Sequence, residues 1–289
     1  SKFDIQTTYL QNIPLMKKKR ELLIPFAPLA FESLDFSKFD LVISSTTFAA
    51  KGIITKPETP HICYCHTPTR YLWNPDIDPR ATEGKFSKFR QKIAHNLRIW
   101  DRVAAERPDF YIANSQTIKN RIKKYYHRDS VVVFPPVEID RFHIAKKEEI
   151  KDYFLFVSRL IGYKKCDVVV EAFNKLGLPL KIIGRGPEKK KLEKIANKNI
   201  EFLGFLSDQD VAKYYAGARG FIFIAEEDFG IVPVEAMASG RPVIAYNKGG
   251  ASETIVDGGT GTFIKSQTAK DLIDAVKNFD EKKFNPATI

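Results

Sequence analysis

The sequence predicts an α/β protein made of two doubly wound domains. Short apolar runs alternate with amphipathic segments along the chain, as strands and helices do when they follow one another. These runs are apolar throughout instead of alternating with polar residues, which is typical of parallel strands covered on both faces. The chain has 289 residues, 44% of them hydrophobic, a length that favours two domains over one.

The C-terminal half contains six candidate strands separated by helical segments. They are YFLFVSRL at 153–160, LKIIG at 180–184, IEFLGF at 200–205, FIFIA at 221–225, PVIAYN at 242–247 and TGTFI at 260–264. Ser207, with Asp210 three residues later, has the pattern of a helix-capping box. Pro233 suits the first turn of a helix whose N-cap would be Val232, and Gly240 follows the expected end of that helix.

The N-terminal half contains four candidate strands. They are LVISST at 41–46, HICYCH at 61–66, DFYIANS at 109–115 and VVVFPPV at 131–137. A doubly wound domain usually has about six strands, so this domain is apparently incomplete, and we expect further strands before Ser1 and more chain after Ile289. The charged run 145–152 is the expected hinge, which gives domains of 1–148 and 149–289.

The formal net charge is +11, and residues 1–145 carry most of it, with 23 Lys and Arg against 15 Asp and Glu. This charge favours an anionic partner, although a solvated basic surface is the alternative. We expect no nucleic-acid partner, since no nucleic-acid-binding module is recognisable. The absence of a signal peptide and of a membrane-spanning run leads us to expect a cytoplasmic protein with reduced cysteines.

The stretch EEDFGIVPVEAMASG at 226–240 is the strongest candidate for a site. It joins an expected strand to an expected helix, and ligands of open parallel sheets bind beyond the carboxyl ends of the strands. The start of a helix there offers free N–H groups to an anion, whereas the carboxylates suit the hydroxyls of a sugar or a ribose. The alternatives are a solvated acidic loop for 226–228 and a helix-capping role for Glu235.

The spacing Glu227-x7-Glu235 resembles the E-x7-E signature of retaining GT-B glycosyltransferases of family four. The likeness covers nearly the whole chain, through HICYCHTPTRYLWN at 61–74, IANSQTIKNRIKKYY at 112–126, PPVEIDRF at 135–142, SRLIGYKK at 158–165 and GGASETIVDGGTG at 249–261. Within the family, the chain is most similar to bacterial and archaeal mannosyltransferases of the O-antigen type. The resemblance implies the GT-B architecture, in which two Rossmann-like domains, an acceptor domain followed by a donor domain, face each other across a cleft.

The resemblance also implies roles for individual residues. Glu227 would hold hydroxyls of the donor sugar, Glu235 those of the ribose, and His66 would contact the sugar. Arg159 and Lys164 would neutralise the departing diphosphate, whose charge grows in the transition state; a solvated basic loop is the alternative. The other expected donor-binding residues are Phe229, then Gly230, Ile231 and Val232 through their backbone amides, and Gly204 and Phe205 near the base.

The segment around His66 also offers potential zinc ligands. His61, Cys63 and Cys65 point to one side of a strand, but they follow one another at about 6.6 Å, whereas zinc ligands lie about 2.0–2.3 Å from the ion. We therefore expect no metal site, place these three side chains in the core, and keep a structural role for His66 as the alternative.

Two other patterns imitate ligand motifs. IIGRGPEKKKL at 182–192 contains Gly184-x-Gly186 but lacks the third glycine of a dinucleotide fingerprint; the resemblance places this loop near the nucleotide only weakly. The sequence DID at 76–78 imitates an Asp-x-Asp metal motif, but its flanking prolines favour a surface loop.

The helix expected over 85–107 carries an apolar face and several basic residues. The face consists of Phe86, Phe89, Ile93, Leu97, Trp100 and Ala104. This is the pattern of a core helix, but together with MKKKRELLIPFAPLAF at 16–31 it also suits peripheral contact with an anionic membrane that presents a lipid-linked acceptor. Both interpretations stay open.

The sequence thus predicts a retaining, metal-independent hexosyltransferase without a cofactor. It would move mannose from GDP-mannose, or another hexose from its nucleotide sugar, onto a hydroxyl of a growing glycan, free or lipid-linked. The rival interpretations are a non-catalytic nucleotide or polyanion binder and a nucleotide-sugar epimerase of the same fold. The presence of Glu227, Glu235, Arg159 and Lys164 together favours transfer.

Overall fold

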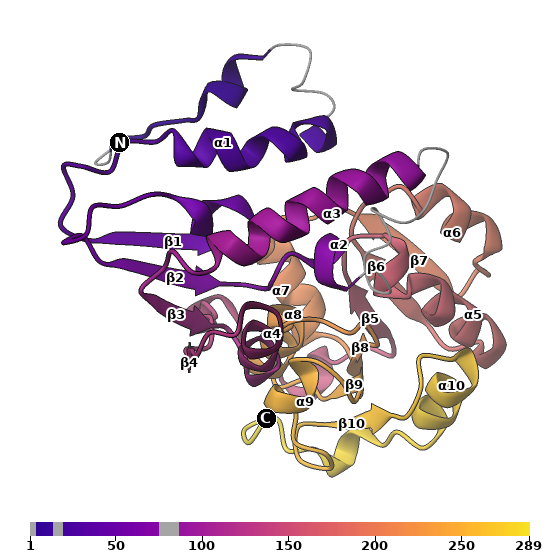
Figure 1. The fold of residues 1–289 in the computed structure, drawn as a ribbon. Helices are drawn as coiled ribbons and strands as arrows, with labels where there is room; N and C mark the ends of the chain where they lie inside the picture. Colours follow the sequence, from indigo (N-terminus) through magenta and orange to yellow (C-terminus); the bar gives the residue numbers. More distant parts are fainter. Residues whose placement is uncertain (1–3, 14–19, 75–86) are drawn as a thin grey trace. The chain divides into compact units, whose positions relative to one another are not determined.

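The computed structural model describes residues 4–13, 20–74 and 87–289, and the chain forms two compact units, Ser1–Phe134 and Pro135–Ile289 (Figure 1). The sequence placed the hinge in the charged run 145–152. In the structure this run belongs to the second unit, and the chain passes from one unit to the other at Phe134 and Pro135.

The first unit is built on a parallel sheet whose four strands lie in sequence order. These are the four strands that the sequence predicts: β1 (Val42–Thr46), β2 (His61–Cys65), β3 (Phe110–Ala113) and β4 (Val131–Val132). The described helices of this unit are α1 (Ala27–Glu32), α2 (Arg70–Trp73), α3 (Ser87–Ala104) and α4 (Gln116–Tyr126), with 3₁₀ turns η1 (Tyr9–Asn12), η3 (Arg20–Phe26) and η4 (Ala49–Gly52). The Asp-x-Asp pattern at 76–78 and Phe86 lie outside the described residues.

Most of the expected core positions of the first unit are at least partly buried. His61, Cys63 and Cys65 are buried in the sheet. On the apolar face of α3, Leu97 and Ala104 are buried and Ile93 and Trp100 partly buried, whereas Phe89 is 65% exposed. The interpretation of the whole face as a core face is therefore wrong at Phe89, because the buried positions of α3 begin only at Ala94.

The second unit contains a parallel sheet of six strands in the order β10-β9-β8-β5-β6-β7. The bounds are β5 (Phe154–Val157), β6 (Leu180–Ile183), β7 (Ile200–Gly204), β8 (Gly220–Phe223), β9 (Val243–Tyr246) and β10 (Gly261–Ile264). Numbered within the unit, the order is 6-5-4-1-2-3, so the chain starts in the middle of the sheet at β5, builds one side, and returns to build the other. This is the doubly wound topology that the sequence predicts.

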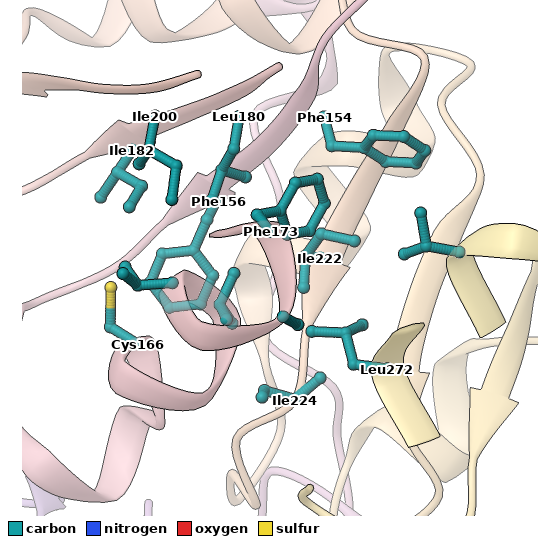
Figure 2. Close-up of a cluster of buried hydrophobic side chains, with 14 of the residues drawn as sticks. Phe154, Phe156, Cys166, Phe173, Leu180, Ile182, Ile200, Ile222, Ile224 and Leu272 are labelled. Atoms are coloured by element: carbon teal, nitrogen blue, oxygen red, sulfur yellow. The ribbon is translucent and has the colours of Figure 1, made fainter. Parts of the chain in front are cut away.

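Helices cover both faces of the second sheet. They are α5 (Cys166–Leu176), α6 (Lys189–Ile195), α7 (Asp208–Ala216), α8 (Ile231–Ala238), α9 (Ala251–Thr254) and α10 (Ala269–Lys277), with 3₁₀ turns η6 (Ile139–Arg141), η7 (Lys147–Glu149), η8 (Gly162–Lys164) and η9 (Glu281–Lys283). Helices α5, α6 and α10 pack on one face through a cluster that includes Phe154, Phe156 and Phe173 (Figure 2). Helices α7, α8 and α9 pack on the other face, which receives Leu155, because side chains of a strand alternate between faces.

The helix starts of this unit follow the predicted capping chemistry at α7 but not at α8. Ser207 caps α7 by accepting a hydrogen bond from the backbone N–H of Asp210, as predicted. Helix α8 begins at Ile231, and its N-cap is Gly230 with φ of 83°. The prediction of Val232 as N-cap is therefore wrong: a glycine tolerates the left-handed backbone at the turn, so the helix starts two residues before Pro233.

Candidate active site

A cavity of about 640 Å³ lies at the carboxyl ends of the strands of the second unit. Its walls come from the segments that follow β5, β6 and β7 and from α8, with one side closed by the segment that precedes the sheet. The lining residues are 157–159, 183–186, 205, 206, 208, 211, Val232 and Glu235, with Arg141 and Phe142 on the remaining side.

The position of this cavity follows from the strand order. At β5 the sheet is built in both directions, toward β6 and toward β8, so the chain segments that leave these strands diverge to opposite faces. Such a point leaves a crevice in which ligands of doubly wound sheets bind. A side chain at Gly184 would meet the carbonyl oxygen of Ser158 at 1.8 Å, so a glycine is required for the two loops to approach this closely.

Glu235 enters the cavity from the second turn of α8 and is held by two donors. Arg141 Nη2 lies 2.9 Å from Oε1, and Tyr215 Oη donates to Oε2 at 3.1 Å. Burial raises the pKa of Glu235 above its ordinary value, while Tyr215 and Arg141 oppose this shift. Glu235 is the fifth residue of the helix and faces these side chains, so it does not cap the helix.

Glu227 and Lys164 form an ion pair in this structure. Lys164 ends the 3₁₀ turn η8, and its Nζ contacts Oε1 of Glu227. Both side chains are largely buried, at 17% and 13% exposed. The acid and the base that the sequence places in one site, 63 residues apart along the chain, therefore lie side by side.

The acidic loop that carries Glu227 is fixed through its backbone. The backbone carbonyl of Glu227 accepts a hydrogen bond of 2.9 Å from the N–H of Gly250. A side chain at Gly249 would meet this carbonyl oxygen at 2.1 Å, and one at Gly250 would meet the carbonyl oxygen of Phe229 at the same distance. The glycine pair that follows β9 is thus the surface against which the loop after β8 packs.

The start of α8 presents the backbone amides that the sequence assigned to an anion. The first N–H groups of a helix have no partner within it, and no hydrogen bond from the N–H of Gly230, Ile231 or Val232 occurs within the described part of the chain. The positive end of the helix dipole adds to the attraction for an anion. Phe229, just before the turn, is buried, so its side chain supports the loop.

Of the remaining expected site residues of the second unit, Arg159 and Phe205 line the same cavity, and Gly204 directly precedes Phe205. Arg159 follows β5 and lines the cavity with its neighbours. Phe205 is 70% exposed, and the Arg185 guanidinium lies over its ring at 4.7 Å from the centroid. Gly204 has φ of 72° and accepts a hydrogen bond from the N–H of Gly184, which ties the loop after β7 to the loop after β6.

His66 belongs to the first unit. It follows β2, and its Nε2 lies 2.8 Å from Ser45 Oγ, with the ring edge-on to Tyr64. The neighbouring His61 is fully buried and bonded to Ser44 Oγ. Among the residues that the structure describes, no group of three or more His, Cys, Asp and Glu side chains could hold a metal ion.

Comparison with known protein families assigns the chain. The sequence model of the family "Glycosyl transferases group 1" matches residues 137–286, and that of "Glycosyltransferase Family 4" matches residues 4–141. This chain belongs to the group 1 glycosyl transferases. The second unit, with its cavity and acidic loop, corresponds to the group 1 match, and the first unit to the family four match.

Several curated proteins are similar to this glycosyl transferase chain. An uncharacterized glycosyltransferase of Methanocaldococcus jannaschii is 26% identical over 284 residues, which are 94% of this chain and 75% of that protein. The O-antigen chain mannosyltransferase C of Escherichia coli is 30% identical over 61% of this chain, and a GDP-mannose-dependent phosphatidylinositol monomannoside mannosyltransferase of Mycobacterium tuberculosis is 32% identical over 49%. The matches span 50% and 44% of these two mannosyltransferases.

Solved structures confirm the fold of the chain. Sucrose-phosphate synthase from Thermosynechococcus elongatus superposes with a TM-score of 0.71 at 16% identity, covering 92% of this chain and 71% of the other. Anabaena HepE in complex with UDP and glucose gives 0.64 at 20% identity, covering 99% and 77%. The predicted GT-B architecture is thereby confirmed.

Sequence reasoning missed part of the cavity of this glycosyl transferase chain. Arg141, Tyr215 and Asp208 surround Glu235 but were not predicted as site residues. The only signal was the segment 135–142, which resembles the family and ends with Arg141 and Phe142. Nothing in the spacing along the chain connects this segment to a carboxylate 94 residues away.

Proposed function

We propose that this chain is a retaining hexosyltransferase that moves mannose from GDP-mannose onto a hydroxyl of a growing glycan. The observation that carries the proposal is the cavity that brings Glu235 and Arg159 together at the carboxyl ends of the strands, beside the start of α8. This arrangement combines carboxylates for hydroxyl groups with cations and amides for phosphates, which is the chemistry of a nucleotide sugar.

Each part of the donor has a partner in this proposal. The diphosphate accepts hydrogen bonds from the amides at Gly230–Val232 and is neutralised by Arg159 and Lys164. Glu235 accepts hydrogen bonds from the ribose, and Glu227 those from the sugar. His66, from the first unit, contacts the sugar as a hydrogen-bond partner.

Donor binding changes the partner of Lys164 in this scheme. In the described structure Lys164 neutralises Glu227. When the diphosphate is present, Lys164 turns to it, and sugar hydroxyls take over on Glu227. The bond between the anomeric carbon and the diphosphate oxygen then breaks, and the acceptor oxygen bonds to this carbon on the same face while its proton passes to the leaving phosphate. This retains the configuration without a protein nucleophile or a metal.

The choice of mannose and guanosine diphosphate comes from the relatives. Two similar proteins are mannosyltransferases by name, one of them GDP-mannose-dependent. HepE was solved with UDP, so base preference is the first point to measure. Thermal shift against GDP, UDP, ADP and dTDP, followed by product analysis with the matching hexose donors, measures it. We expect GDP to stabilise the protein most, and α-linked mannose as the product.

Two substitutions test the assigned roles. Glu235→Ala removes two charge-assisted hydrogen bonds of about 1.5–3 kcal/mol each and is expected to weaken GDP binding tenfold or more.

Lys164→Gln is expected to lower kcat more than it raises KM, since the negative charge that Lys164 neutralises grows as the bond to the sugar breaks. Glu201→Ala, on an exposed edge of β7, is the matched control.

The rival functions predict different results in the same assays. Stabilisation by nucleotides without turnover in the presence of any acceptor indicates a non-catalytic binder. Conversion of the donor without an acceptor indicates an epimerase. A clear preference for UDP overturns the mannosyl assignment and leaves the transferase.

The acceptor proposal includes contact with an anionic membrane. In the first unit, Leu22, Phe26 and Leu29 of η3 and α1 follow one another at spacings of four and three residues and are between 52% and 62% exposed. In the described parts of the chain no helix is long and apolar enough to cross a membrane. Co-sedimentation with phosphatidylglycerol vesicles tests the proposal. Phe26→Glu should reduce binding and Ile139→Glu, at a more exposed apolar position of the second unit, should not.

A further inference from the structure

We propose that Arg141 is the positioning residue that holds the Glu235 carboxylate for the donor ribose, an inference that rests on the proposed function. Arg141 ends the 3₁₀ turn η6, before the first strand of the second unit. It belongs to no candidate set that the sequence defined. Its side chain is 22% exposed, and it lines the same cavity as Glu235.

The Arg141 guanidinium lies among three carboxylates. Nη2 lies 2.9 Å from Glu235 Oε1, while Nη1 lies 3.1 Å from Asp208 Oδ2 and 3.8 Å from Glu138 Oε2. The guanidinium also lies over the Phe142 ring, 4.8 Å from its centroid. The planar fork of arginine has its donors in fixed directions, so contacts on both nitrogens fix the position of the group that faces Glu235.

The two donors on Glu235 leave part of the carboxylate available. Arg141 occupies one site on Oε1, and Tyr215, which is fully buried, occupies one site on Oε2. A carboxylate has about four acceptor sites, so each oxygen retains one for a ligand hydroxyl. Two neighbouring hydroxyls, such as those of a ribose, match two neighbouring acceptor oxygens.

Arg141 is the cation that favours the ionised form of Glu235. Burial and the Asp208 carboxylate raise the pKa of Glu235, whereas Tyr215 and Arg141 lower it. Arg159 and Arg185 also line the cavity. Without Arg141 the carboxyl keeps its burial and the repulsion from Asp208, so it takes up a proton at higher pH and loses acceptor capacity.

This mechanism predicts a specific pH dependence. Glu235 accepts ribose hydroxyls in its ionised form, so binding is present above its pKa and is lost as the pH falls through it. Arg141→Gln moves this loss to higher pH. Asp208→Asn removes a like charge and moves the loss to lower pH. A structural role for Arg141, tethering the segment before β5, changes stability without moving the pH profile.

The experiment is calorimetric titration of GDP and UDP into the full chain from about pH 5 to about pH 8.5. We expect Arg141→Gln to weaken binding most at the acid end of this range and to regain affinity as the pH rises. Arg141→Lys, which keeps the charge, should lose less, and Asp208→Asn should shift the acid limb in the opposite direction. In the double variant Arg141→Gln with Glu235→Gln the added pH dependence should vanish.

A second measurement needs no ligand. Carbon-13 NMR of the glutamate carboxyl groups, assigned with Glu235→Gln, reports the titration of Glu235 directly, and we expect Arg141→Gln to raise its pKa. An unchanged titration, or a loss of affinity equal at every pH, overturns the positioning role. If the wild-type chain binds no nucleoside diphosphate, the proposed function and the inference about Arg141 both fail. If the wild type binds and Arg141→Gln has the same affinity and the same pH profile, only the inference about Arg141 fails.

Discussion

The two units are stabilised by interiors of different kinds. The largest cluster of the second unit consists of buried apolar side chains from α5, α6, α10 and the strands, as Figure 2 shows. The first unit has smaller apolar clusters and, beside them, an ion pair that is almost completely buried, Lys51 with Asp101. Lys51 is 1% exposed and Asp101 is 0% exposed.

The buried pair is completed by neutral groups. Lys51 Nζ lies 2.5 Å from Asp101 Oδ1, and this carboxylate also accepts hydrogen bonds from Thr69, Trp73 and Tyr126. The ammonium donates to the carbonyl of Phe48, and aromatic rings surround it at 5.2–5.9 Å. Four donors on one carboxylate offset the cost of removing its charge from water.

The difference teaches that apolar burial and ionic burial respond to mutation in different ways. An apolar cluster loses stability in proportion to the volume removed, and neighbours relax into part of the space. A buried ion pair that loses one member leaves the other charged in a medium that cannot solvate it. Four changes test this distinction.

The largest effect is expected for Asp101→Ala. It leaves the Lys51 charge unpaired and three neutral donors without their acceptor, which costs about 5 kcal/mol of unfolding free energy. Chemical denaturation measures it. Lys51→Met is the matched control and should cost less, because Asp101 keeps Thr69, Trp73 and Tyr126. Equal losses for the two variants would mean that the neutral donors contribute nothing.

The second-largest effect is expected for Phe173→Ala, with a loss of about 4 kcal/mol of unfolding free energy. Phe173 is fully buried on α5 and packs edge-on against Phe154, with ring centroids 5.5 Å apart. Phe173→Leu retains most of the volume and should cost about 1.5 kcal/mol or less. Denaturation of both variants at one pH gives the comparison, and a leucine variant as unstable as the alanine variant would contradict a volume-dependent loss.

The burial of His61 predicts that the first unit loses stability as the pH falls. Burial lowers its pKa from 6.5 to about 4. As the pH falls below 6.5, the unfolded chain binds a proton that the folded chain refuses, so stability is full above the ordinary pKa and is lost toward pH 4. The shift corresponds to about 3 kcal/mol.

Unfolding free energies of the wild type and of His61→Gln, measured against pH, check this prediction. The slope between the two pKa values should be smaller in His61→Gln, because the titrating group is gone. His95→Gln, at an exposed position of α3, should leave the slope as it is in the wild type. Identical slopes in the wild type and His61→Gln would show that other groups cause the acid loss.

The smallest effect is expected for the exposed pair Glu171 and Lys175. They lie one turn apart on α5, with Nζ and Oε1 at 2.7 Å and more than half of each side chain exposed. Lys175→Ala should change the unfolding free energy by about 0.5 kcal/mol or less. A loss above that of Phe173→Leu would remove the contrast between buried and exposed pairs.

The sequence predicts the strands of both units better than it predicts the buried ion pair of the first unit. All ten described strands overlap the runs that the sequence predicts, and the strands of the second unit are mostly apolar because helices cover both faces of their sheet. The ion pair leaves a weaker signal: Asp101 lies four residues after Leu97 on α3, within the apolar face, but no pattern connects it to Lys51, 50 residues earlier. Contacts between distant segments depend on packing that periodicity does not encode.

The candidate site shows the same limit. Lys164, Glu227 and Glu235 lie in segments with recognisable spacing, and the sequence placed them in one site. Arg141 and Tyr215 are bound to Glu235 only through tertiary structure, and the start of α8 was placed late because a glycine N-cap carries no side-chain signal.

The glycine pair at 249 and 250 sets how closely two loops approach each other. The loop after β8 contacts these glycines through its main chain, while Glu227 and Asp228 are held by an ion pair and by burial as well. A side chain at either glycine would displace the acidic loop even when every side chain at 226–228 is retained. Gly249 and Gly250 should therefore tolerate no replacement.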